Sequence, residues 1–161
     1  MCFNKFLFKE YSIANEDKLC FKIMTKKNGN TLESYIYGFL YEIGKTYEDD
    51  SVPIDVLNSK NSLEGGVFHS YSQIPFDCLC EMWVDNQHPF YRRQYLVECT
   101  IPKGARYWFN PEDHTFASNK IRIDKVVDID KLIRDTLGKY LYNKKINLCV
   151  SIKIPEIIHI K

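Results

Sequence analysis

The sequence predicts an α+β fold in which a mainly antiparallel sheet carries two helices. Several segments rich in aromatic and β-branched residues are separated by turn residues, which is typical of strands. Two other segments repeat apolar residues at helical spacing. The chain has 161 residues, 45% of them hydrophobic and 27% charged, which suits one globular domain spanning residues 1–161.

The first predicted strand covers residues 18–24, where apolar content is high. A turn at residues 25–30 follows, because Asn-Gly provides the positive φ angles that tight turns require. Residues 34–48 are rich in Tyr, Ile and Phe and predict one long bent strand or two short ones. Gly38 and Gly44 in this segment indicate a bulge or a close backbone approach.

The middle of the chain predicts a loop, a short strand and a helix. Residues 49–66 are polar and rich in turn formers, whereas residues 67–71 favour a strand. Ser72 is the expected N-cap of a helix that ends near Val84, with Pro75 in the first turn. Its apolar stripe consists of Ile74, Cys78, Leu79, Met82 and Trp83.

Residues 93–101 form the best strand pattern in the chain, since apolar residues flank its centre on both sides. A Pro-Lys-Gly turn at residues 102–104 leads to the start of another strand at residues 106–109. Residues 120–127 alternate in the manner of a half-buried strand.

The C-terminal part predicts a second helix and a last strand. Asp128 or Asp130 is the expected N-cap, and the helix extends to about Tyr142 with one apolar face. Residues 146–154 then predict a strand that ends before Pro155.

Composition excludes several function classes. Twenty-two Lys and Arg oppose 21 Asp and Glu, so the net charge of +1 gives no general attraction to nucleic acid or anionic lipid. None of the six cysteines forms a Cys-x-x-Cys pair, and the four histidines lack metal-ligand spacing, so we expect reduced thiols and no metal site. Neither a signal peptide nor a membrane span is evident, which predicts a soluble, intracellular protein.

The densest group of reactive residue types follows a glycine pair. His69 could act as a general base beside Ser70 and Tyr71. Strand alternation places His69 and Tyr71 on one face and Phe68 and Ser70 on the other, so the group does not form one site. The favoured interpretation is structural, with Phe68 in the core, His69 half-buried, and Ser70 or Ser72 capping the helix.

Two carboxylates, Glu98 and Glu112, could pair in space, although Glu98 is expected on a solvated strand face. Aromatic residues and arginines gather in a second kind of segment. The candidate binding residues are Arg92, Arg93, Tyr95, Tyr107 and Trp108. This combination is typical of protein hot spots and of single-stranded nucleic-acid sites. The structural alternative is a strand entry with arginines that extend toward solvent, and one shared patch requires the two segments to lie on neighbouring strands.

Three short motifs carry a resemblance. Residues 38–47 (GFLYEIGKTY), 66–69 (GVFH) and 117–123 (ASNKIRI) are similar to an uncharacterised domain of phage and prophage proteins. Residues 98–105 also resemble a giant-virus domain found beside pentapeptide repeats. The similarity covers roughly residues 19–129, departs from the phage pattern at Val67, and does not include the C-terminal helix and strand at 130–161. It implies a viral origin and no assigned activity.

The order of elements also faintly resembles that of ADP-ribosyltransferases. Those enzymes hold NAD with an Arg or His on the first strand and a Glu near a late strand. Here the first strand offers Cys20, Phe21 and Lys22, and the late segment 115–118 contains no Glu. A fold analogy without its site is weak support for an activity.

The leading functional hypothesis is a viral accessory protein that is not an enzyme. It would bind a host or viral protein in the host cytoplasm, without cofactor or membrane, and so counter or redirect a host pathway. The alternative is an NAD-using enzyme resembling ADP-ribosyltransferases, for which His69, Tyr71 and Glu112 are the candidate catalytic residues. A weaker alternative is single-stranded nucleic-acid binding through Arg92, Arg93, Tyr95 and Trp108.

Overall fold

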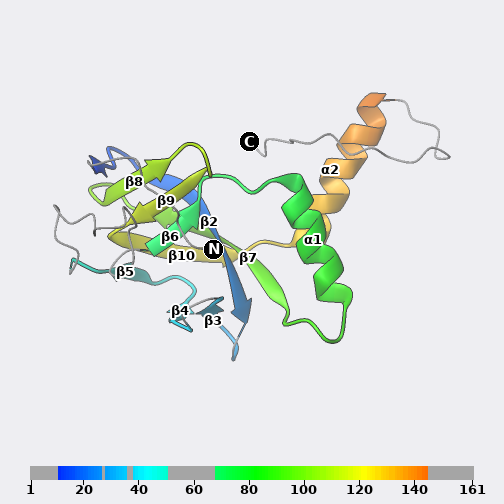
Figure 1. Ribbon diagram of the computed structural model, residues 1–161, viewed down its shortest axis with the longest axis horizontal. Coiled ribbons are helices and arrows are strands. Elements are labelled where there is room, and N and C mark those ends of the chain that lie inside the picture. Colours follow the sequence, from blue (N-terminus) through cyan, green and yellow to red (C-terminus); the bar gives the residue numbers. More distant parts are fainter. Residues whose placement is uncertain (1–10, 27, 36–37, 51–67, 145–161) are drawn as a thin grey trace.

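A computed structural model describes residues 11–26, 28–35, 38–50 and 68–144 (Figure 1). The strand expected at residues 146–154 and most of the loop expected at 49–66 lie outside these ranges. Ten strands form one sheet, and every strand pairing in the described ranges is antiparallel. With two helices, the fold is α+β and mainly sheet, as predicted.

The elements follow one another along the chain in a fixed order. The strands are β1 (Ser12–Ile13), β2 (Lys18–Lys26), β3 (Thr31–Ser34), β4 (Leu40–Glu42), β5 (Thr46–Glu48), β6 (Phe68–Tyr71), β7 (Gln94–Ile101), β8 (Arg106–Asn110), β9 (Thr115–Ser118) and β10 (Lys120–Val126). The helices are α1 (Phe76–Gln87) and α2 (Ile129–Lys144). The main path of the sheet is β1-β8-β9-β6-β2-β7-β10-β5, and β3 and β4 extend from β2.

The long central pair β2–β7 confirms the two strongest strand predictions. Their register runs from Lys18 opposite Ile101 to Thr25 opposite Gln94. The Asn-Gly prediction is also confirmed, because Asn28 and the following glycine both have positive φ, of 47° and 56°. The turn is shorter than expected, since β2 continues to residue 26 and β3 begins at residue 31.

Two alternatives were predicted for residues 34–48, one long bent strand or two short strands. The second is confirmed, and the two short strands are β4 and β5. Gly38 and Gly44 have positive φ angles of 65° and 88°, which let the chain turn before β4 and between β4 and β5. The amide of Gly44 donates to the carbonyl of Ile123 at 2.7 Å, which attaches this turn to β10.

The sheet is rolled because β9 and β10 are almost one strand. They lie four positions apart in the order β9-β6-β2-β7-β10, which is about 19 Å in a flat sheet. Only Asn119 separates them in sequence, and one residue spans about 7 Å. The sheet therefore has to curl until its distant strands meet at this corner.

Asn119 is buried at the corner and satisfies polar groups of two other segments. Its Oδ1 accepts from the Arg106 amide at 2.8 Å, and its Nδ2 donates to Asp50 Oδ1 at 2.8 Å. Its backbone amide donates to the carbonyl of Arg106, and its carbonyl accepts from the amide of Asp49. One side chain thus joins the β9–β10 bend to β8 and to the end of β5.

Rolling gives the sheet an inner and an outer face. The inner face holds a core that includes Cys20, Met24, Val97, Cys99, Ile121 and Ile123. The outer face of β2 and β7 packs against both helices, with Phe76, Leu79, Met82, Leu96, Ile129 and Ile133 at the centre of the contact. Figure 1 shows the helices side by side at one end of the sheet.

Helix α1 corrects three sequence expectations. It begins at Phe76 after Pro75 and ends at Gln87, three residues beyond the predicted end. Ser72 is not its N-cap, because the Ser72 hydroxyl and amide both donate to the carbonyl of His114. Trp83 is 41% exposed rather than part of the buried stripe, and its Nε1 donates to Asp130.

Helix α2 confirms one of the two caps considered. The Asp128 carboxylate accepts from the Lys131 amide at 2.9 Å, which is the geometry of an N-cap. The described residues contain no helix long and apolar enough to cross a membrane.

Lys22 lies on the inner face, between Cys20 and Met24 on β2, and is only 9% exposed. Its ammonium group donates to the carbonyl of His69 and lies 5.5 Å from the ring centre of Tyr41. Burial lowers the pKa of Lys22, since the low-dielectric interior disfavours its charged form. The sequence analysis predicted no charged residue in the interior of the sheet.

We expect Leu96→Ala to lower the free energy of unfolding by about 2–5 kcal/mol, because it opens a cavity between β7 and the helices. The matched control is Leu19→Ala on neighbouring β2, where the side chain is 55% exposed and the change should be within about 0.5 kcal/mol. Urea denaturation measures both. Equal losses would contradict the assigned core.

We expect Asn119→Ala to cost about 1–3 kcal/mol, because it leaves the Arg106 amide without its acceptor and removes one of the two donors to Asp50 Oδ1, the other being the Arg106 guanidinium. Asn30→Ala, at an exposed turn position, is the control and should change stability by less than about 0.5 kcal/mol. A thermal unfolding midpoint for Asn119→Ala equal to that of the wild type would show that the corner does not depend on this side chain.

We expect Lys22→Met to raise the free energy of unfolding at pH 7 by about 1–3 kcal/mol, because it removes a charge from an apolar interior. Between the lowered pKa of Lys22 and the ordinary lysine pKa of about 10.4, the unfolded chain binds more protons at Lys22, so wild-type stability should rise with pH there. Burial raises the pKa of Cys20 to about 11 and also raises that of Cys99, which gives an opposite slope above the ordinary thiol pKa of about 8.5.

The test is urea denaturation of wild-type and Lys22→Met protein at several pH values up to about 10, and the difference between the two removes the thiol contribution that they share. Lys22→Met should flatten the rise with pH, whereas Lys125→Met, at a side chain 65% exposed, should leave it unchanged. A Lys22→Met protein less stable than the wild type at pH 7 would contradict the prediction.

Candidate functional site

The loop from α1 to β7 carries the most exposed aromatic side chains among the described residues. Phe90 is 88% exposed and Tyr91 is 60% exposed. Both rings lie against His88, with ring centres 5.5 and 4.9 Å from the imidazole. Single exposed apolar side chains are common on protein surfaces, whereas neighbouring exposed rings such as these are a feature of interaction sites.

Hydrogen bonds fix the shape of this loop. The side chain of Asn86, in the last turn of α1, donates to the carbonyl of Gln94 at 2.8 Å and accepts from the Gln94 amide at 2.7 Å. The Tyr91 amide donates to the carbonyl of His88 at 3.3 Å. The two ends of the loop are thus held together, and the aromatic side chains project from a constrained backbone.

An ion pair connects the loop to the β3–β4 hairpin. Arg92 Nη2 lies 2.9 Å from Glu33 Oε2, and the Glu33 side chain is mostly buried. The hairpin turn brings Gly38 against the same carboxylate, where an added Cβ would lie 3.3 Å from Glu33 Oε1. Phe39 and Leu40 beyond this turn are also exposed.

The last residue before β7 is a second arginine, Arg93. Its guanidinium carbon lies 5.5 Å from the ring centre of Tyr95, which is a cation–π contact. No carboxylate pairs with Arg93 in the described part of the chain. We name the loop surface formed by His88, Phe90, Tyr91, Arg92 and Arg93 the α1–β7 surface.

The structure divides the predicted binding residues into two groups. Arg92 and Arg93 belong to the α1–β7 surface, and Tyr95 supports it. Tyr107 and Trp108 lie on β8, which is separated from β7 by three strands, β9, β6 and β2, in the sheet order. The condition of neighbouring strands for one shared patch is therefore not met.

The two β8 aromatics take part in packing instead. Trp108 is buried and contacts Tyr11 with ring centres 5.9 Å apart. Tyr107 packs edge-on against Phe116, and the Lys18 ammonium lies 5.2 Å from the Tyr107 ring centre. The sequence alone did not distinguish these buried aromatic residues from the exposed ones, because both kinds occur in segments rich in aromatic and basic residues.

The candidate catalytic residues occupy the outer face of β6 and a nearby turn. Tyr71 packs with the core beneath the helices, and burial raises its pKa, so the phenol stays protonated at neutral pH. His69 lies two residues earlier on β6, opposite Ala117. Glu112 lies in the β8–β9 turn, where its amide donates to Asn110 Oδ1. The alternation predicted for His69 and Tyr71 agrees with the packing of Phe68 in the inner core.

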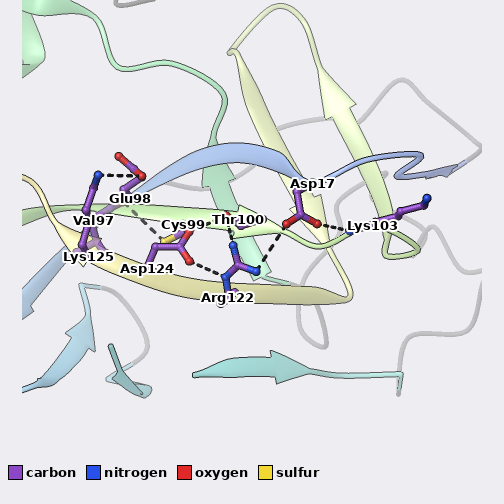
Figure 2. Close-up of polar contacts among 9 residues, drawn as sticks. All are labelled: Asp17, Val97, Glu98, Cys99, Thr100, Lys103, Arg122, Asp124 and Lys125. Carbon is purple, nitrogen blue, oxygen red and sulfur yellow. Dashed lines mark hydrogen bonds and ion pairs between the residues drawn. The ribbon is translucent and has the colours of Figure 1, made fainter. Parts of the chain in front are cut away.

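Glu98 belongs to a polar network on the outer face of β7 and β10 (Figure 2). It pairs with Lys125 at 3.3 Å, next to a register shift between Ile123 and Lys125. The Glu98 side chain is 28% exposed, so the face that was expected to be solvated is half-buried at this position.

Arg122 is the centre of a second, separate polar network on β7 and β10. It contacts Asp124 at 2.6 Å, Thr100 at 3.1 Å and Asp17 at 3.6 Å, while Asp17 also accepts from the Lys103 amide (Figure 2). Asp124 raises the pKa of Arg122 through this hydrogen bond, so the guanidinium remains charged. Since its donors already have partners within the fold, this network ties the turn before β2 to β7 and β10.

In the described residues, no group of three or more His, Cys, Asp or Glu side chains could hold a metal ion. The four cysteines in these residues are thiols, and the two on the inner face are fully buried. The α1–β7 surface therefore has the clearest features of a site, namely exposed aromatic side chains on a constrained loop. Comparisons with protein-family models, curated proteins and solved structures find no match to this chain.

Proposed function

We propose that this chain is a protein-binding module without enzymatic activity and that it binds its partner through the α1–β7 surface. The observation that carries the proposal is the 88% exposure of Phe90 on a loop that hydrogen bonds hold in shape. An apolar ring held in water represents free energy that burial in an interface can recover. A constrained loop also loses little conformational entropy when it binds.

The residue types at this surface support a protein partner. Tyrosine and arginine are enriched among the few interface residues that dominate binding energy. Tyr91 and Arg92 lie next to Phe90, and the Glu33 contact orients the Arg92 guanidinium. In the setting implied by the viral resemblance, the partner is a host or viral protein in the host cytoplasm, and binding counters or redirects a host pathway.

We expect the double variant Phe90→Ser/Tyr91→Ser to weaken partner binding at least about 30-fold, because even one hot-spot side chain contributes about 2 kcal/mol or more. The measurement is affinity capture from host lysate with quantitative mass spectrometry, followed by titration of the captured protein. Both side chains are exposed, so the thermal midpoint should remain close to that of the wild type.

The matched control is Leu19→Ser, which removes an exposed apolar side chain from β2. It should capture the same partner as the wild type. If the double variant captures the same proteins with equal affinity, the α1–β7 surface is not the binding site.

A further inference from the structure

The charges of the α1–β7 surface are not balanced. Arg92 is neutralised by Glu33 at 2.9 Å, whereas Arg93 has no carboxylate partner in the described ranges. Asp85, the nearest acidic residue in the preceding helix, forms no ion pair with Arg93 there, although its carbonyl accepts from the His88 amide. One guanidinium charge thus remains on the loop that also carries the exposed rings of Phe90 and Tyr91.

The geometry of Arg93 suits a carboxylate. Its guanidinium lies over the face of Tyr95, a contact that restricts the long side chain and reduces the entropy lost on binding. Arg93 is exposed, and a guanidinium carries five N–H donors, so the contact with one ring leaves donors accessible to an acceptor. A planar fork of donors pairs with both oxygens of a carboxylate in one plane.

Resting on the proposed function, we infer that the partner presents an acidic segment in which Asp or Glu lies next to an apolar side chain. The carboxylate pairs with Arg93, and the apolar side chain packs on Phe90 and Tyr91. The argument is charge complementarity beside an apolar contact, since an acidic group recovers an ion pair that the chain itself does not supply.

Single-stranded nucleic acid fits this surface less well. Its backbone requires several cations along a groove together with stacking rings, and binding then falls steeply with salt. Here only Arg93 lacks a carboxylate partner among the described loop residues, and Trp108 lies buried on β8, away from the surface.

The test is selection of random dodecapeptides displayed on phage against the immobilised full chain. Synthetic versions of the enriched peptides are then titrated by fluorescence polarisation at 50 and 200 mM salt. We expect the enriched peptides to share Asp or Glu adjacent to an aromatic or aliphatic residue. Arg93→Gln should weaken their binding about ten- to hundredfold, as loss of a charged hydrogen-bonded pair predicts.

The matched control is Arg134→Gln on α2, which removes the same charge from another exposed position and should leave peptide binding unchanged. Enriched peptides without acidic residues, whose binding is lost in Phe90→Ser/Tyr91→Ser, would overturn the acidic segment while the protein-binding function stands. Binding of a thymidine 20-mer, with a steep salt dependence and no enriched peptide, would overturn both.

Discussion

The structure depends on the covalent continuity of β9 and β10 through Asn119. Two strands that a flat sheet would place far apart have to meet within one residue, so the sheet rolls and encloses an inner face. Asn119 stabilises this corner, because its side-chain amide forms hydrogen bonds with a backbone amide of β8 and with a carboxylate next to β5. The short motif SNKIRI therefore has a structural explanation, in which the Asn forms the corner and the two Ile residues face the inner core.

The roll also determines where the helices lie and where the α1–β7 surface is displayed. Once the inner face is enclosed, the outer face of β2 and β7 needs its own cover, and α1 and α2 supply it. Helix α1 leads directly into β7, so the connecting loop has to emerge at the edge of this helix–sheet contact. Asn86 and Gln94 are paired for that reason, since one belongs to the last turn of the helix and the other is the first residue of the strand.

Sequence patterns predicted the parts of the fold that depend on local signals. The apolar content of β2 and β7, the Asn28–Gly29 turn and the Asp128 cap are all set within a few residues. The short strand β9 was not predicted, because its four residues become buried only through pairing with β6 and β8 on both sides. Ser72 was predicted to be a helix cap from its local sequence. Its actual partner, the carbonyl of His114, is 42 residues away in the chain, and a local pattern does not show such a contact.

Lys22 shows the same limit inside the core. Alternation along β2 could place either Cys20, Lys22 and Met24 or Leu19 and Phe21 in the interior, and a lysine favours the solvent in a flat sheet. The roll reverses this, because the face that carries Lys22 becomes the enclosed one. The amine then keeps a backbone acceptor in the carbonyl of His69 and the face of Tyr41.

The candidate site was only partly predictable for a related reason. Arg92, Arg93 and Tyr95 were identified from their residue types, yet Tyr107 and Trp108 have the same types and are used in packing. What separates the two groups is the sheet order, which is a long-range property. Phe90 and Tyr91 belong to neither core, so they contribute little to the stability of the fold. Side chains of that kind can change without unfolding the protein, and a binding surface built from them can adapt to a partner while the rolled sheet stays constant.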